Sequence, residues 1–250
     1  MARRRTRRKR RNNRGRFAVL YRLLTFVVIC GAIVGALALF FKVEHIEVEG
    51  NTRYTQEEVI TASGLKTGDN LFLMNKYEVA SRIRDELNYV ESVRITRSLP
   101  STLHIVITEC RFTVAVEQEG TLWLVSGTGK IVDQVTPDTG TYAMVTGLDL
   151  KDPQLGQSIR SENETACREL LELLELLRDK KMLEDVQAIH LEDASLITLR
   201  YLDRFTVQLP WASDLDYKLN YLQAVVERLE DNEKGTINMM QDHKVNFIPD

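Results

Sequence analysis

The first hydrophobic segment of the chain contains no charged residue. It runs from Leu23 to Phe41 and reads LLTFVVICGAIVGALALFF, 19 residues among which only Thr25 is modestly polar. At a rise of 1.5 Å per residue, such a helix is about 28 Å long, close to the ~30 Å hydrocarbon core of a bilayer. The pattern therefore predicts one transmembrane helix.

The next segment, from Val43 to Cys110, alternates between the periods of strands and helices. A first strand is indicated by three apolar residues among charges, Val43, Ile46 and Val48. Two helices follow, each predicted by the spacing of its capping residues: Thr55 with Glu58, and Asn75 with Glu78. Alternation returns at 91–97 and 102–109, around a turn at 99–101. The predicted order is strand, helix, helix, strand, strand, with both helices on one side of a three-stranded sheet.

The remaining chain, residues 112–249, carries two amphipathic helices among short alternating runs. A hairpin is predicted in WLVSGTGKIVD, with Gly127 or Gly129 at its turn. After a capping segment at 161–164, the first helix has a buried stripe: Cys167, Leu170, Leu174 and Leu177. Its glutamates are interpreted as a solvated face: Glu169, Glu172 and Glu175. The rest of this segment is predicted to form strands within 186–209, a helix at 214–229 and strands at 236–241 and 244–248. The predicted fold class is α+β, with a mainly antiparallel second sheet.

Charge divides the chain into a basic tail and an acidic body. Residues 1–16 hold ten basic residues and no acid: Arg3, Arg4, Arg5, Arg7, Arg8, Lys9, Arg10, Arg11, Arg14 and Arg16; Arg22 adds an eleventh before the hydrophobic segment. From Lys42 to the end there are 22 basic and 36 acidic residues, a formal balance of −14 (22 minus 36). Basic residues flank the cytoplasmic side of membrane helices, so we expect a single-pass type II topology with the body outside the cytoplasmic membrane.

Two alternatives concern this N-terminal region. Ala36-Leu37-Ala38 has the small-x-small form of a signal-peptidase site, but the apolar run continues to Phe41 and is longer than a usual signal core, which favours an uncleaved anchor. The basic tail could bind lipid headgroups or nucleic acid. Its position beside a spanning segment favours lipid, and the acidic body argues against nucleic acid as a partner.

Sequence motifs for catalysis are missing from the chain. The stretch SGTGK at 126–130 lacks the first glycine and the following Ser or Thr of a phosphate loop, so a hairpin turn is the simpler interpretation. The four histidines are scattered without metal-ligand spacing, and the three cysteines favour buried thiols over a disulfide. We therefore expect no cofactor, no metal and no enzymatic activity, and interpret the body as a binding module.

The body resembles the FtsQ/DivIB family of bacterial cell-division proteins. The resemblance is carried by VEHIEVEGNTRYTQEEVITASGLKTGDNLFLMN and VESVRITRSLPSTLHIVITE, and more loosely by WLVSGTGKIVD and VTGLDLKDPQLGQSI. It implies four segments: a cytoplasmic tail at 1–22, a transmembrane helix at 23–41, a POTRA domain at 42–111 and a partner-binding β domain at 112–250. A domain that starts directly after the anchor is expected to be held close to the membrane.

The resemblance also implies a function in the division septum. Such a protein is a scaffold that binds the small bitopic proteins FtsL and FtsB or DivIC, and helps to coordinate the septal peptidoglycan synthase complex. Partner strands are expected to add to open sheet edges. One candidate is the C-terminal edge, with four alternating apolar residues: Ile237, Met239, Val245 and Phe247. These residues could equally complete the core. A second candidate is the POTRA edge near 43–48 and 103–109. The alternative function is an extracytoplasmic POTRA-type chaperone or transport subunit.

Overall fold

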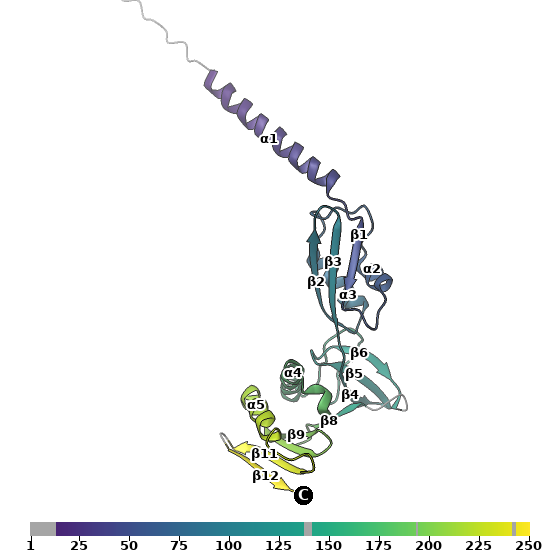
Figure 1. The fold of residues 1–250 in the computed structure, drawn as a ribbon, viewed down its shortest axis with the longest axis vertical. Coiled ribbons are helices and arrows are strands. Elements are labelled where there is room, and N and C mark those ends of the chain that lie inside the picture. The colour runs from purple at the N-terminus through teal and green to yellow at the C-terminus, as the bar shows by residue number, and fades with distance from the viewer. Residues whose placement is uncertain (1–13, 138–141, 194, 242–243) are drawn as a thin grey trace, which may run out of the picture.

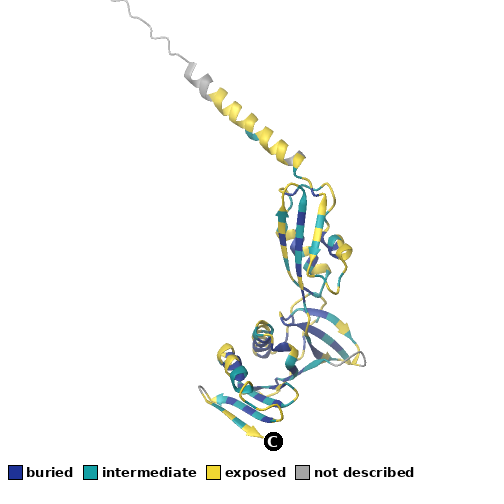
Figure 2. Cartoon of the chain, viewed as in Figure 1, coloured by how far each residue is buried: buried dark blue, intermediate teal, exposed yellow. Residues whose placement is uncertain are grey.

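The computed structural model describes residues 14–137, 142–193, 195–241 and 244–250. Figure 1 shows a long N-terminal helix followed by two domains stacked end to end, which we call the first domain (41–110) and the second domain (113–250). The helix, α1 (Arg14–Phe40), begins nine residues before the expected start at Leu23. Within it, Leu20–Leu37 is long and apolar enough to cross a bilayer, and none of this window is buried against the rest of the chain (Figure 2). The basic residues before Arg14 lie outside the described residues.

The first domain has the order of elements expected from the sequence. It contains β1 (His45–Glu49), α2 (Gln56–Ser63), α3 (Lys76–Glu86), β2 (Val90–Ser98) and β3 (Thr102–Glu109). The sheet order is β1-β3-β2, with β1 parallel and β2 antiparallel to the central strand β3. Both helices pack on one face and enclose a core of twelve buried residues: Val43, Val59, Ala62, Leu71, Val79, Ala80, Ile83, Val90, Ile95, Leu103, Ile105 and Ile107.

The helices of the first domain start and stop at the residues that the sequence indicates. Thr55 and Glu58 form a complete capping box, in which the Thr55 side chain accepts from the Glu58 N–H and the Glu58 carboxylate accepts from the Thr55 N–H. Asn75 caps α3 by accepting from the Tyr77 N–H. Gly64 ends α2 with φ +66°, a left-handed conformation that glycine adopts without steric strain.

The second domain is built on one sheet of nine strands. Its strands are β4 (Thr113–Gln118), β5 (Thr121–Ser126), β6 (Ile131–Val135), β7 (Ala143–Thr146), β8 (Val186–His190), β9 (Leu196–Tyr201), β10 (Phe205–Pro210), β11 (Gly235–Gln241) and β12 (Lys244–Pro249). The order across the sheet is β12-β11-β10-β9-β8-β7-β4-β5-β6. Five of the eight strand pairs are antiparallel, and three, β4 with β7, β7 with β8, and β10 with β11, are parallel. The predicted α+β class with a mainly antiparallel sheet is confirmed.

Two helices bury the apolar side of this sheet. They are α4 (Glu164–Asp179) and α5 (Leu215–Val226), and a short 3-10 helix, Leu183–Asp185, leads from α4 into β8. The predicted stripe on α4 is buried, and α5 contributes Leu215, Leu219 and Leu222 to the same core. Alternate residues of β4 and β5 project to the opposite face, where Ala115, Leu122 and Leu124 form a smaller cluster with Val132. This second cluster lies beside the first domain.

One glutamate on α4 differs from its predicted environment. Glu172 and Glu175 are exposed as expected, but Glu169 is buried. It lies between Ala166 and Leu173 on the inward stripe, where its Oε2 accepts from the Ala212 N–H at 3.3 Å. The interpretation of Glu169 as solvated is therefore wrong, because a backbone donor in the loop before α5 compensates the burial of its carboxylate.

Candidate partner-binding edge

The two ends of the nine-stranded sheet differ in how far they are covered. At the β6 end, the chain folds back over the start of the edge strand: the Ile131 N–H donates to the Gln157 carbonyl, and the Ile131 carbonyl accepts from the Gly156 N–H, both at 2.8 Å. At the other end, β12 pairs with β11 on one side only, and no described strand lies beyond it. An uncovered edge offers N–H and C=O groups to an added strand. β12 is therefore the open edge of the second domain.

The two faces of β12 have different character. Val245 and Phe247 are half-buried and pack on the core, where the Phe247 ring meets Phe205 edge-to-face with centroids 6.2 Å apart. Lys244 and Asn246 are exposed, and Ile248 is 56% exposed. An arriving strand would extend an apolar surface on one face and meet solvated side chains on the other.

The four residues predicted for partner binding lie close together but in two environments. Ile237 and Met239 on β11 are fully buried, so they belong to the core beneath the edge. On the neighbouring strand, Phe247 is paired with Ile237, while Val245 lies nearer the bulge between the two strands. Direct contact of any of the four with a partner stays a prediction. The exposed positions of the edge are Lys244, Asn246, Ile248 and Pro249.

A buried lysine joins α5 to β11 next to the edge. The Lys218 Nζ donates to the Met239 carbonyl at 2.8 Å, although the side chain is only 3% exposed. Outside it, the rings of Tyr217 and Tyr221 stack with centroids 6.1 Å apart on the surface of α5. The bond from Lys218 therefore fixes the distance between the helix and the last two strands, and with it the position of the edge. Periodicity alone could not identify this contact.

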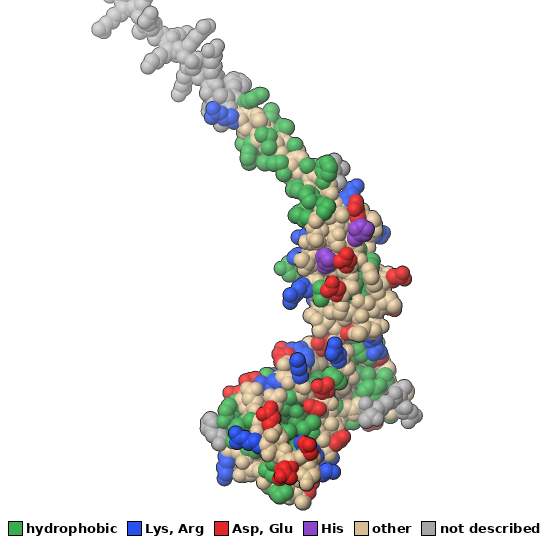
Figure 3. Space-filling model, in the orientation of Figure 1, with side chains coloured by type: hydrophobic (Ala, Val, Ile, Leu, Met, Phe, Trp, Pro, Cys, Tyr) green, Lys and Arg blue, Asp and Glu red, His purple; other side chains and the backbone are tan. Residues whose placement is uncertain are grey.

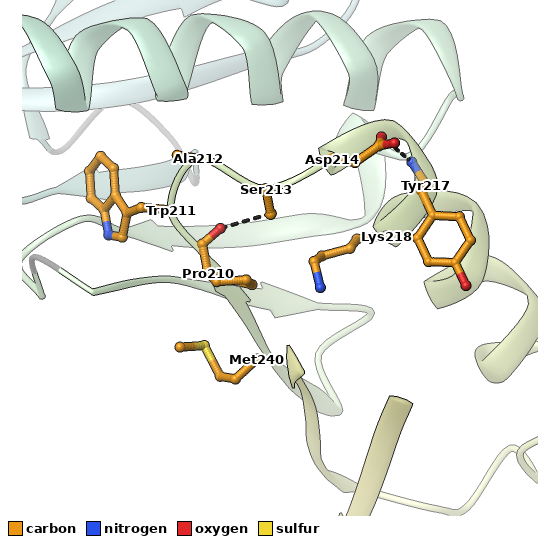
Figure 4. Close-up of a pocket in the computed structure, with 8 residues that line it drawn as sticks. All are labelled: Pro210, Trp211, Ala212, Ser213, Asp214, Tyr217, Lys218 and Met240. Carbon is orange, nitrogen blue, oxygen red and sulfur yellow. Dashed lines mark hydrogen bonds between the residues drawn. The ribbon is translucent and has the colours of Figure 1, made fainter. Parts of the chain in front are cut away.

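A cavity of about 540 Å³ opens beside Lys218 (Figure 4). It is lined by Pro210, Trp211, Ala212, Ser213, Asp214, Tyr217, Lys218 and Met240. The segment 210–214, which leads into α5, is held by two hydrogen bonds. Ser213 Oγ donates to the Pro210 carbonyl at 2.9 Å, and Asp214 Oδ1 accepts from the Tyr217 N–H at 3.0 Å. Within the described residues, no group of three or more His, Cys, Asp or Glu side chains could hold a metal ion, here or elsewhere.

The SGTGK stretch is the turn between β5 and β6, so the hairpin interpretation is confirmed. Gly129 has φ +77°, and the Ser126 N–H donates to the Lys130 carbonyl at 2.9 Å. The Lys130 ammonium donates to the Arg84 carbonyl of the first domain at 2.6 Å. All three cysteines are free thiols; Cys167 is buried as expected, whereas Cys110 is only half-buried. Burial, with Glu91 nearby, raises the pKa of the Cys110 thiol to about 12, so it is protonated at neutral pH.

Polar contacts hold the two domains together, and sequence reasoning missed them. Tyr89 Oη donates to Asp133 Oδ2 at 2.8 Å, and the Arg53 guanidinium lies 3.6 Å from the centre of the Tyr89 ring. Burial and the bond to Asp133 raise the pKa of the Tyr89 hydroxyl well above its usual value, so it stays a donor. We call Arg53, Tyr89 and Asp133 the junction triad. Tyr89 also packs on the small cluster of β4 and β5.

The loop that carries Arg53 is fixed by one carboxylate at the end of β3. Glu109 accepts from the N–H groups of Thr52, Arg53 and Tyr54 and from the Thr52 hydroxyl, at 2.7 to 3.2 Å. Burial raises the pKa of this carboxyl, but the four hydrogen bonds outweigh burial and leave it below the usual glutamate value. Glu109 therefore remains ionised at neutral pH.

The first domain has its own edges, and one expectation about them is wrong. β3 is the central strand, so residues 103–109 cannot accept an added strand. The edges are β1 and β2, which confirms only the part of the expected region around β1. The Gln56 side chain donates to the Ile46 carbonyl at 2.9 Å and covers part of the β1 edge. Strand order is set by pairing between distant segments, which alternation does not reveal.

The fold and its open edge define a class of protein. Its members have a POTRA-type β-α-α-β-β domain that directly follows one apolar helix, and a second sheet domain with an open C-terminal edge. Two family models match the chain: "POTRA domain, FtsQ-type" at residues 41–109 and "Cell division protein FtsQ/DivIB, C-terminal" at residues 114–240. The chain belongs to the FtsQ/DivIB family of cell division proteins.

Individual relatives agree with the family models. The chain is 30% identical to cell division protein FtsQ of Corynebacterium glutamicum over 182 residues, which cover 71% of this chain and 76% of the relative. It is 24% identical to cell division protein DivIB of Clostridium botulinum strain Hall over 205 residues, covering 80% and 78%. It is 26% identical to FtsQ of Syntrophotalea carbinolica over 197 residues, covering 76% and 67%. A role in cell division follows from the family, and the apolar helix fits a membrane protein of the septum.

Proposed function

We propose that the chain is a non-enzymatic scaffold of the division assembly that captures an extended segment of a small bitopic division protein at the β12 edge. The partners are proteins of the FtsL and FtsB or DivIC type, and their capture helps to coordinate septal peptidoglycan synthesis. One observation carries the proposal: within the described residues, no strand or loop pairs with the outer side of β12, whereas loop 156–159 pairs with the start of the opposite edge strand, β6. β12 therefore offers the longer free edge to an added strand.

The membrane topology is part of the same proposal. The helix Leu20–Leu37 crosses the cytoplasmic membrane once, with the basic tail inside and both domains outside. Outside the cell membrane, the acidic surface of the domains would repel nucleic acid but not a peptide strand, because strand addition uses main-chain hydrogen bonds. The anchor keeps the open edge near partners that are anchored in the same membrane.

Site-specific photo-crosslinking in dividing cells tests the edge. A photoreactive amino acid at Asn246 or Ile248, both exposed on β12, is expected to crosslink to an FtsL-, FtsB- or DivIC-type protein. The matched control is Gln134, which is exposed on β6 at the opposite end of the sheet. A charge at Met239 is a poor test, because Met239 is buried and the variant would disturb the core whether or not a partner binds. Equal crosslinking from β6 and β12, or none from β12, would refute capture at this edge.

Localisation tests the wider role. A fluorescently tagged copy is expected to concentrate at midcell, and depletion of the native copy is expected to give filaments. Uniform label around the envelope with normal septation would contradict a septal scaffold. That result would favour the alternative, an extracytoplasmic chaperone or transport subunit that uses its POTRA domain to receive clients.

A further inference from the structure

Four large hydrophobic side chains are exposed at the end of the first domain that faces α1. Their exposed fractions are 44% for Phe72, 76% for Leu73, 85% for Tyr77 and 57% for Leu99. We call these four residues the apolar cluster. They come from two segments that are tied together, because Arg97 Nη2 donates to the Met74 carbonyl at 3.1 Å. Single exposed hydrophobic residues are ordinary, but a group at one end of a domain marks an interaction surface.

The loop that carries Phe72 and Leu73 is bonded to the end of the apolar helix. Asn70 Nδ2 donates to the Leu37 carbonyl at 3.0 Å, and the Leu71 N–H donates to the Phe41 carbonyl at 2.9 Å. The ring of Phe72 meets the ring of Phe41 edge-to-face, with centroids 5.1 Å apart. The loop therefore lies level with the last turn of α1. Figure 3 shows the hydrophobic side chains of the helix continuing to the point where it meets the first domain.

The depth of this loop follows from helix geometry. If Leu20–Leu37 fills the hydrocarbon layer, Phe41 lies about 6 Å beyond it at 1.5 Å per residue. The polar headgroup layer is itself about 5–8 Å thick on each side. Phe72, in contact with Phe41, then falls within the lipid–water interface, where aromatic side chains are enriched in membrane proteins.

Charges around the apolar cluster are mixed. The Arg97 guanidinium lies 5.9 Å from the centre of the Phe72 ring, Lys66 is exposed, and Lys42 forms a β-bridge with Asn70. Lys76 precedes Tyr77 at the start of α3. The Asp69 carboxylate accepts from the Lys66 N–H, and Glu78 follows Tyr77 on the exposed side of α3. These four basic and two acidic residues allow attraction to anionic lipid to add to the insertion of the apolar side chains.

We propose that the apolar cluster inserts into the outer interface of the same bilayer that α1 crosses, so that the first domain is fastened to the membrane at a second point. The occupant is lipid, because the ring of Phe72 contacts Phe41, directly after α1, so that the cluster adjoins the apolar surface of the helix in space. The inference rests on the proposed membrane anchor but not on partner capture at β12. Attachment at two points restricts rotation of the domain about the helix axis.

Spin-label accessibility in the full-length chain tests this attachment. The chain, with its three cysteines replaced by alanine, is reconstituted into vesicles of phosphatidylethanolamine and phosphatidylglycerol. Single labels are placed after Leu73→Cys, Ile29→Cys and Glu57→Cys, and each is probed with oxygen, which concentrates in lipid, and with a water-soluble nickel chelate. Ile29 lies in the spanning window and Glu57 is exposed on α2. The label at 73 is expected to favour oxygen, as at 29, whereas the label at 57 favours the chelate.

A charged variant adds a second measurement. In the double variant Leu73→Asp and Tyr77→Asp, a label at Leu99→Cys is expected to shift from oxygen toward the chelate. Leu155→Asp, at a leucine that is 48% exposed in the second domain, is the matched control and is expected to leave that label unchanged. Both substituted positions of the double variant are solvent-exposed, so the fold is retained and circular dichroism verifies this.

The outcomes separate this inference from the proposed function. A label at 73 that favours the chelate while the label at 29 favours oxygen overturns lipid insertion and leaves the anchor intact. Chelate access at both positions overturns the anchor and the insertion together. A label at 73 that leaves water only when a division partner is added also overturns the proposal, and assigns the apolar cluster to protein binding.

Discussion

The carboxylate of Glu109 controls the loop that carries Arg53 of the junction triad. Glu109→Gln keeps the shape of the side chain but removes its charge and one of its two acceptor oxygens. With the amide oxygen in the place of Oε2, the donors of Thr52 and Arg53 keep a neutral acceptor, while the Tyr54 N–H faces an NH₂ group. One charge-assisted bond is lost outright and the other three weaken.

The size of the effect follows from these bonds. A hydrogen bond to a charged group contributes about 1.5–3 kcal/mol, and charge-assisted bonds are roughly twice as strong as neutral ones. Because the bonds share one carboxylate and are not additive, we expect loop 52–54 to be destabilised by about 3 kcal/mol. Amide hydrogen exchange of the full-length chain, followed by mass spectrometry, measures this opening locally, which suits a chain that does not unfold in two states. Exchange within 52–54 is expected to accelerate while α4 is unchanged.

The lowered pKa of Glu109 determines how the effect of Glu109→Gln changes with pH. The pKa of Glu109 is lower in the folded chain than its ordinary value of 4.5, so the ionised group stabilises the fold above that value. This contribution falls as the pH drops below 4.5 and through the folded pKa. The difference between the native chain and Glu109→Gln is therefore constant near neutral pH and shrinks in acid. Glu49→Gln, an exposed glutamate at the end of β1, is the matched control. Equal exchange at neutral pH, or a difference that does not shrink in acid, would refute the reasoning.

Three further substitutions test the core, the edge and the junction. Leu170→Ala, at a fully buried position of α4, is expected to destabilise the core of the second domain by about 2–5 kcal/mol, read from the amide exchange of α4. Lys218→Met removes the bond to the Met239 carbonyl and is expected to destabilise β11 and β12 by about 1.5–3 kcal/mol, read from their amide exchange. Tyr89→Phe removes the bond to Asp133, and is expected to broaden the distance between spin labels on the two domains.

Matched controls exist for each of the three. The control for Leu170→Ala is Leu155→Ala, at a half-exposed leucine, and the control for Lys218→Met is Lys234→Met, at an exposed lysine. The control for Tyr89→Phe is Tyr77→Phe, at a tyrosine that is 85% exposed. Each control is expected to leave the corresponding measurement unchanged. A variant that behaves like its control contradicts the contact on which it is based. For Tyr89→Phe, an unchanged distance distribution would mean that Arg53 and the packing around Tyr89 hold the domains without its hydroxyl.

Local signals in the sequence predicted the elements of the first domain because each has a short-range cause. The capping residues Thr55 and Asn75 start the two helices as expected. The buried stripe on α4 was also predictable from its period. The same helical period, applied to Glu169, already indicated its burial. At 100° per residue, Glu169 lies on the same side of the helix as Leu173.

Features that depend on distant segments could not be predicted in this way. Nothing local indicates that β3 lies between β1 and β2, or that loop 156–159 pairs with the start of β6. Ile237 and Met239 have the alternation of strand residues, but their burial depends on α5, which packs over β11 and donates the Lys218 bond. The sequence therefore indicated the location of the open edge, while the exposed positions of that edge required the three-dimensional structure.

The junction triad has a consequence for the length of any partner. The chain passes from β3 to β4 through residues 110–112 alone, and Tyr89 and Asp133 bond across that passage. With the domains stacked end to end (Figure 1), the first domain separates β12 from α1. Under the proposed topology, β12 therefore lies at a fixed distance from the bilayer. A partner anchored in the same membrane must have a rigid segment long enough to place its binding segment at the same distance from the bilayer. The scaffold would then select partners by the spacing between membrane and motif as well as by the motif itself.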